Sequence, residues 1–223
     1  MSNDQAQADR PKADRSAVER SSVRISLPER DELTVEQQKI YDDMLNGPRG
    51  VVVGPIRAVI HSPELADRWQ KLGEYVRYRT VIPEMLKELA IVVSARRWNS
   101  ELEWSVHTKI AREAGLSQTV IDAIHAGRAP EFSDPTAAEI YEYARELQMS
   151  GHVSDDTYLA IKNRWGEKGV VELTAVIGYY TMVAMTLNAH HVPVPEGTPS
   201  TLVPEGETLP RDLSVMAPPA GHK

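Results

Sequence analysis

The segment EWSVH, residues 103–107, carries two side chains whose types and spacing suit acid–base chemistry. Glu103 and His107 are four residues apart, so on a helix they share one face and can form a hydrogen bond. Because Ile110 and Ala111 continue this face, the pair is predicted to point into the protein. A carboxylate that fixes the tautomer and protonation of an imidazole builds a general base. An i,i+4 pair that only stiffens a helix is the structural alternative.

A second carboxylate, Glu88, has apolar neighbours on its predicted helix, with Leu89 and Val92 among them. In a functional interpretation it is buried and shares protons with Glu103 and His107, as a third catalytic group. In the alternative interpretation Glu88 lies on the surface, because the same helix also has a polar side. The spacing alone does not separate these two interpretations.

Arginines near these acids could hold the carboxylate of a substrate, because a guanidinium binds a carboxylate with two parallel hydrogen bonds. Arg77 and Arg79 lie at the end of one predicted helix, and Arg97 lies at the end of the next. Each of them could equally be a solvated surface charge. Trp104 could line an apolar pocket, or it could belong to the core.

Composition excludes several classes of chemistry. The chain has 223 residues and no cysteine, which removes disulfides, thiolate nucleophiles, Cys-ligated zinc and thiol peroxidase activity. A net charge of −7 argues against nucleic-acid binding, which needs a basic face. No secretory or transit signal is visible and no apolar run is long enough to span a bilayer, so we expect a cytoplasmic protein without a membrane partner.

Helix signals dominate the sequence, which predicts an all-α fold. Caps such as Thr34, Ser117 and Ser154 precede apolar-periodic segments, and glycines such as Gly115 follow them. The predicted helices cover residues 35–46, 63–78, 83–98, 101–114, 118–127, 136–150, 155–166 and 167–189. The only strand signal is the short run 51–53.

The two ends of the chain differ from this helical region, so we divide the chain into three parts. Residues 1–30 lack periodicity and are predicted to form a disordered or extended arm. Residues 31–192 form the helical domain. Residues 193–223 are rich in proline, which predicts a tail that is either disordered or laid across a neighbouring subunit.

A degenerate internal repeat is also possible. Glu88 precedes His107 by 19 residues, and Glu172 precedes His191 by the same interval. Both glutamates are followed by leucine and an apolar helix. A chance match between common residues is the competing explanation.

The segments SPELADRWQKLGEYVRYRT, LKELAIVVSARRWNSELEWSVHTKIAREAGLSQTVIDAI and GEKGVVELTAVIGYYTMVAMTLNAHHVPVP resemble the carboxymuconolactone decarboxylase and alkyl hydroperoxidase D family over residues 45–197. The resemblance implies an all-helical bundle that assembles into trimers or hexamers. In the peroxidase branch, a glutamate is followed by CxxC and a histidine, and these positions fall on Glu88, Ser100, Glu103 and His107. Both thiols are therefore replaced, which favours the decarboxylase branch and puts Ser100 beside the substrate.

From these observations we expect a cofactor-free lyase or isomerase that acts on a small carboxylate- or lactone-bearing metabolite of aromatic catabolism. The predicted catalytic residues are His107, Glu103 and Glu88, and the predicted substrate-binding residues are Arg77, Arg79, Trp104, Ser100 and Arg97. We expect no metal, because no ligand spacing supports a site, although a centre built from Glu103, His107 and His191 stays an alternative. A non-catalytic oligomeric scaffold or ligand-binding protein of the same fold is the other alternative.

Overall fold

The computed structural model describes residues 23–195, apart from 49 and 53, together with residues 198, 202 and 213. These residues form helices and loops and contain no strand, which confirms the all-α prediction. The elements are the 3-10 turn η1 (Arg30–Glu32) and the helices α2 (Val35–Leu45), α3 (Gly54–Val59), α4 (Pro63–Tyr78), α5 (Glu84–Arg97), α6 (Glu101–Glu113), α7 (Gln118–His125), α8 (Pro135–Ser150) and α9 (Asp155–His190).

Three predicted cap residues stand at the N-termini of helices in the structure. The Thr34 hydroxyl accepts a hydrogen bond from the backbone N–H of Gln37, whose side chain bonds back to Thr34. Ser117 and Ser154 cap α7 and α9 through their hydroxyls in the same way. Such caps satisfy N–H groups that have no partner within the helix.

The structure adds one short helix to those predicted and keeps a predicted break in α9. The strand signal of residues 51–53 leads to no strand among its described residues, since Val51 and Val52 lie in an irregular segment. The next residues form the short helix α3, which the sequence analysis missed although Pro55 stands in the first turn, where proline is tolerated. The break predicted between helices 155–166 and 167–189 is confirmed, since the long element α9 consists of two helical stretches that meet at a kink, with non-helical torsions at Gly166.

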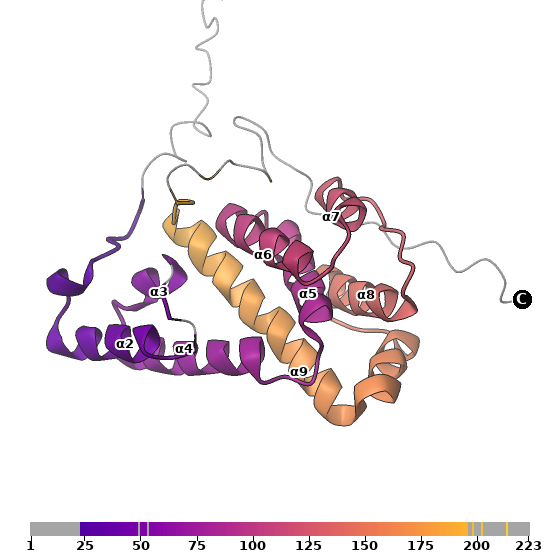
Figure 1. Ribbon diagram of the computed structural model, residues 1–223, viewed down its shortest axis with the longest axis horizontal. Coiled ribbons are helices and arrows are strands. Elements are labelled where there is room, and N and C mark those ends of the chain that lie inside the picture. Colours follow the sequence, from indigo (N-terminus) through magenta and orange to yellow (C-terminus); the bar gives the residue numbers. More distant parts are fainter. Residues whose placement is uncertain are drawn as a thin grey trace, which may run out of the picture.

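The helix α9 lies between two groups of helices, as Figure 1 shows. Helices α2, α3 and α4 pack together on one side, and α5 with α6, α7 and α8 forms the other side. Helix α5 is buried along most of its length, from Leu86 to Arg96. α9 is long and apolar enough to cross a bilayer, but 56% of its most apolar window is buried within this fold, which is the position of a core helix.

Segments outside the helices close the fold at one end. The backbone N–H of Arg24 donates to the carbonyl of His190 at the end of α9. Leu202 and Leu213, from the predicted tail, are buried in the main apolar core of their own chain. Residues 1–22 and most of 193–223 lie outside the described residues, so the predicted domain limits stay predictions.

The suggested repeat does not bring a second glutamate and histidine together. Glu172 and His191 are 19 residues apart along α9, and its regular part rises 1.5 Å per residue, which separates them by about 28 Å. Glu172 instead accepts hydrogen bonds of 2.6 Å from the Tyr75 hydroxyl and from the backbone N–H of Val81. It therefore ties α9 to α4 and to the loop that follows α4.

Candidate functional site

A cavity of about 680 Å³ lies between the two helix groups. Residues of α3, α4, α6 and α9 line it, together with Leu27 before the first helices and residues 192–195 after α9. Most of the lining is apolar. Its polar and aromatic members are Arg57, Trp69, Arg77, Tyr78, Glu103, His107, Tyr179 and Tyr180.

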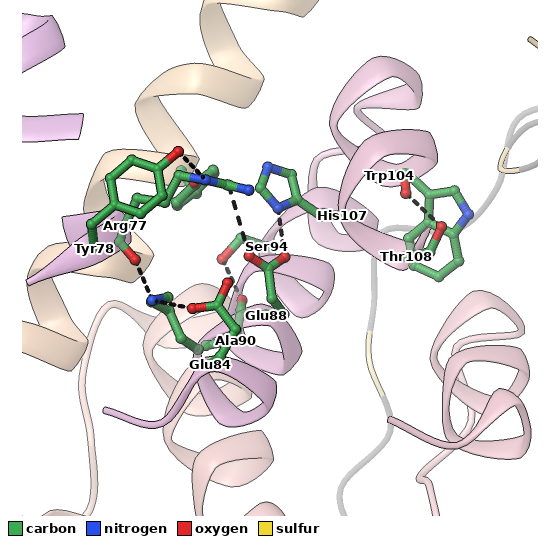
Figure 2. Close-up of polar contacts among 11 residues, drawn as sticks. Arg77, Tyr78, Glu84, Glu88, Ala90, Ser94, Trp104, His107 and Thr108 are labelled. Atoms are coloured by element: carbon green, nitrogen blue, oxygen red, sulfur yellow. Dashed lines mark hydrogen bonds and ion pairs between the residues drawn. The ribbon is translucent and has the colours of Figure 1, made fainter. Parts of the chain in front are cut away.

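His107 reaches from this wall to a carboxylate behind it. Its Nδ1 lies 2.7 Å from Oε2 of Glu88, a fully buried residue of α5 (Figure 2). The carboxylate accepts a hydrogen bond from Nδ1–H, which fixes the ring orientation, so that Nε2 is the ring nitrogen that does not face Glu88. The predicted hydrogen bond between Glu103 and His107 is therefore wrong: the carboxylate that orients the imidazole comes from the neighbouring helix α5, because α5 and α6 pack closely.

Arg77 completes the charge balance around Glu88. Its Nη1 lies 3.7 Å from Glu88 Oε1 and donates to the Tyr180 hydroxyl at 3.2 Å, while Nε donates to the Tyr78 hydroxyl. Burial alone would lower the pKa of Arg77, but Tyr180 and Glu88 raise it above its ordinary value. The guanidinium is thus a permanent positive charge in the cavity wall.

The backbone that carries Arg77 is held by a buried lysine. Lys87 donates from Nζ to the carbonyl oxygen of Arg77 and to Glu84 Oε2, and only 3% of Lys87 is exposed. This cation also satisfies a carbonyl in the last turn of α4, where helix carbonyls lack partners. Figure 2 shows how α4 and α5 are joined at this point.

Glu103 occupies the same wall but is in a different electrostatic state. It is 2% exposed, and within the described part of the chain neither of its oxygens lies within hydrogen-bond geometry of a partner. Burial raises the pKa of its carboxyl well above the ordinary 4.5; the nearby Ser100 hydroxyl opposes this change and Glu88 adds to it. Burial therefore favours the protonated, uncharged form of Glu103, which can donate a proton or a hydrogen bond.

Tyr180 is a member of the site that the sequence analysis did not identify. It is 4% exposed, lines the cavity and sets its ring edge-on to His107, with the ring centroids 4.8 Å apart. The sequence analysis placed this residue only within the predicted helix 167–189. Its distance of more than seventy residues from His107 in sequence gave no signal of the contact.

Three of the predicted substrate-binding residues lie away from the cavity lining. Arg79 is paired with Glu74 on the exposed side of α4, and Arg97 donates to the carbonyl of Gln148 and stacks over Trp98. Trp104 is buried and packs against His125, and Figure 2 shows it pointing away from the cluster around Glu88.

The other two predicted residues lie nearer. Arg77 lines the cavity, and Ser100 is fully buried at the start of α6, beside Glu103 but outside the lining. Among the described residues, no three His, Asp or Glu side chains converge in the manner of a metal site. The alternative centre of Glu103, His107 and His191 is therefore not assembled here.

Residues 63–146 match the sequence profile of the carboxymuconolactone decarboxylase family. A search of curated proteins found no significant match. Among solved structures, a cysteine-to-alanine variant of the debrominase Bmp8 in complex with 2,3,4-tribromopyrrole superposes with a TM-score of 0.62 at 15% identity, over 78% of this chain and 92% of that one.

Two bacterial structures are also similar to this chain. An AhpD-core, peroxidase-related protein from Ralstonia eutropha JMP134 gives a TM-score of 0.63 at 12% identity, over 78% of this chain and 92% of its own. An AhpD-type protein from Agrobacterium tumefaciens gives 0.53 at 16% identity, over 61% and 94%. These similarities confirm the predicted AhpD-like fold.

Proposed function

Because residues 63–146 belong to the carboxymuconolactone decarboxylase family, we propose that this chain is a lyase or isomerase that moves protons on a small carboxylate- or lactone-bearing metabolite. The observation that carries the proposal is the 2.7 Å contact between His107 Nδ1 and Glu88 Oε2 at the wall of a cavity large enough for such a molecule. With no cysteine in the chain, thiol-based redox chemistry is not available to it.

The two carboxyl groups of the site are assigned different roles. Glu88 faces both Arg77 and His107, so it acts as the carboxylate that orients the imidazole. Burial raises the pKa of the Glu103 carboxyl and so favours its protonated form, and we assign it the role of proton or hydrogen-bond donor. Environments that hold two carboxyls in opposite protonation states are typical of acid–base enzymes.

In a decarboxylation, the C–C bond to the leaving carboxylate breaks and its electron pair passes into a conjugated carbonyl, which becomes an enolate. CO2 leaves, and the enolate carbon takes one proton from the imidazolium of His107 or from Glu103. In an isomerisation, His107 Nε2 removes a proton from one carbon and returns it to another. Arg77 holds the anionic oxygen in both cases.

The apolar lining supports a substrate with a flat or ring-shaped body. Trp69 and Tyr179 pack edge-on against each other at the cavity, and Leu102 and Val183 lie in the same wall. The debrominase that shares this fold holds a brominated pyrrole, which is a small aromatic ring. We therefore include aromatic and lactone rings in the proposed substrate class, with catabolism of aromatic compounds as the setting.

The test is a panel of unsaturated lactone carboxylates and β-keto acids incubated with the protein in deuterium oxide. NMR then reports substrate loss and deuterium incorporation at carbon, and a CO2 assay separates decarboxylation from isomerisation. We expect turnover that disappears in His107→Asn. His152→Asn is the matched control, because His152 is exposed in the turn after α8.

A second function, non-catalytic ligand binding on the same fold, predicts a different result. Panel compounds would then bind and stabilise the protein, but no proton at carbon would exchange. This outcome would overturn the lyase proposal.

A further inference from the structure

Tyr180 presents a hydrogen-bond donor for which the described residues offer no acceptor. A phenol hydroxyl has one hydrogen to donate and lone pairs that accept. The Tyr180 oxygen accepts from Arg77 Nη1 at 3.2 Å, which uses a lone pair and leaves the hydrogen. In the described part of the chain, no carboxylate, carbonyl or hydroxyl takes that hydrogen, and Tyr180 lines the cavity.

Three contacts hold this hydroxyl in place. Arg77 binds its oxygen, His107 packs on its ring with an interplanar angle of 81°, and Tyr179 packs edge-on at 5.3 Å. Because the ring is 4% exposed, little rotational freedom remains to be lost when a ligand binds. A donor fixed in this way suits a substrate oxygen that becomes negatively charged during the reaction.

The surrounding charges favour an anionic acceptor. Arg77 is positive, and among the described residues Glu88 is the carboxylate that faces it. His107 shares that same carboxylate, and burial raises the pKa of Glu103, which favours its uncharged form. Arg57 adds a second guanidinium to the lining, so the described wall favours an anion. Burial also raises the pKa of Tyr180, and Glu88 adds to this while Arg77 opposes it, so the phenol keeps its proton at neutral pH.

We propose that Tyr180 and Arg77 form an oxyanion site, and that the cavity binds planar, largely apolar molecules that carry one phenolate- or enolate-type oxygen against the Tyr180 hydroxyl. The inference deepens the proposed function, because an enolate of this kind is the intermediate expected of the lyase. The role of this site in catalysis rests on the proposed function. Binding of a stable oxyanion does not, because it needs no turnover.

The probe is 4-nitrophenol, whose phenolate form absorbs at a different wavelength from the phenol. It is titrated with the full chain at a single pH somewhat below its own pKa, so that the titratable groups facing Tyr180 keep one state in every variant. These groups are Arg57 on α3, Arg77 and Tyr78 on α4, Glu88 on α5, Glu103 and His107 on α6, and Tyr179 on α9.

We expect the bound probe to shift toward the phenolate, and Tyr180→Phe to weaken its binding roughly 10-fold, the loss typical of a hydrogen bond to a charged group. Tyr143→Phe is the matched control: Tyr143 is also a buried tyrosine, but its hydroxyl bonds to Thr174, away from the cavity. The neutral ether 4-nitroanisole tests the wild type directly and is expected to bind at least about tenfold more weakly.

Three results would each overturn the oxyanion site. The protein could bind nitrophenol in its un-ionised form, it could bind the ether as tightly as the phenol, or a folded Tyr180→Phe variant could bind the probe as tightly as the wild type. The proposed function fails independently. Tyr180-dependent binding of nitrophenolate without turnover of any panel compound supports the site and removes the lyase. Turnover by a protein that does not bind nitrophenolate supports the lyase and removes the oxyanion site.

Discussion

Oε2 of Glu88 and Nδ1 of His107 lie 2.7 Å apart, although the two residues are on different helices and 19 positions apart in the chain. Both are buried, and Arg77 faces the other oxygen of Glu88 at 3.7 Å. The imidazole is thus held by a carboxylate that has its own counter-charge.

Glu88 and His107 are expected to act as one unit. Glu88→Gln and His107→Asn should each remove most of the turnover, and the double variant should lose little more than either single variant, because the carboxylate acts through the imidazole. Kinetics and melting temperature are measured on the same three proteins. Additive losses of turnover would mean that the two groups work separately.

Glu103 is expected to make stability depend on pH. Since burial raises the pKa of its carboxyl, the folded protein retains a proton that the unfolded chain releases above about pH 4.5. The wild type should therefore lose stability relative to Glu103→Gln as the pH rises above that value. Melting curves from pH 4 to pH 8 check this. Parallel curves for the two proteins, with exposed Glu64→Gln as control, would contradict it.

Glu172 is expected to be a structural carboxylate with the opposite pH dependence. Burial would raise its pKa, but hydrogen bonds from Tyr75 and Val81, with Lys168 nearby, lower it below the ordinary value. Glu172→Gln should cost about 1–3 kcal/mol of unfolding free energy at neutral pH. The cost should shrink as the pH falls through the lowered pKa, because the wild-type carboxylate then gains its proton. Denaturant unfolding measures both, and a cost that persists in acid would refute the assignment.

Gly166 is expected to resist substitution. It interrupts α9 with φ of 66° and ψ of −169°, a conformation that side chains with a Cβ rarely adopt. The space around it is open, so any cost of Gly166→Ala comes from the backbone. We expect a loss of about 1–3 kcal/mol in unfolding free energy. Gly178→Ala, in a regular and open part of the same helix, is the control and should be neutral or stabilising.

The protein is expected to be a homo-oligomer, a trimer or hexamer by family resemblance. Val171 and Met185 are exposed on the same face of α9, and Val171 is 68% exposed, which leaves an apolar surface available to another subunit. Light scattering should give a multiple of 24.8 kDa, and Val171→Glu with Met185→Glu should lower it. A wild-type monomer at micromolar concentration would end this prediction.

The sequence by itself determined the helices and the chemistry that the chain lacks. Thr34, Ser117 and Ser154 cap helices in the structure as predicted, because a cap is a contact between residues two or three positions apart. The absence of cysteine excludes thiol chemistry whatever the fold. The glutamates and the histidine of the site were also recognisable, since ionisable side chains in apolar segments stand out.

Only the tertiary structure decided which of these groups meet. The i,i+4 rule places Glu103 near His107. The packing of α5 against α6 instead brings Glu88 within hydrogen-bond distance of the imidazole. Glu103 has no hydrogen-bond partner among the described residues. The tertiary structure also selects Arg77 over Arg79 and Arg97 as the arginine of the cavity, and it brings in Tyr180 from α9. Local sequence sets the hydrogen bonds within a helix, whereas the rotation and crossing of each helix depend on how the whole core packs.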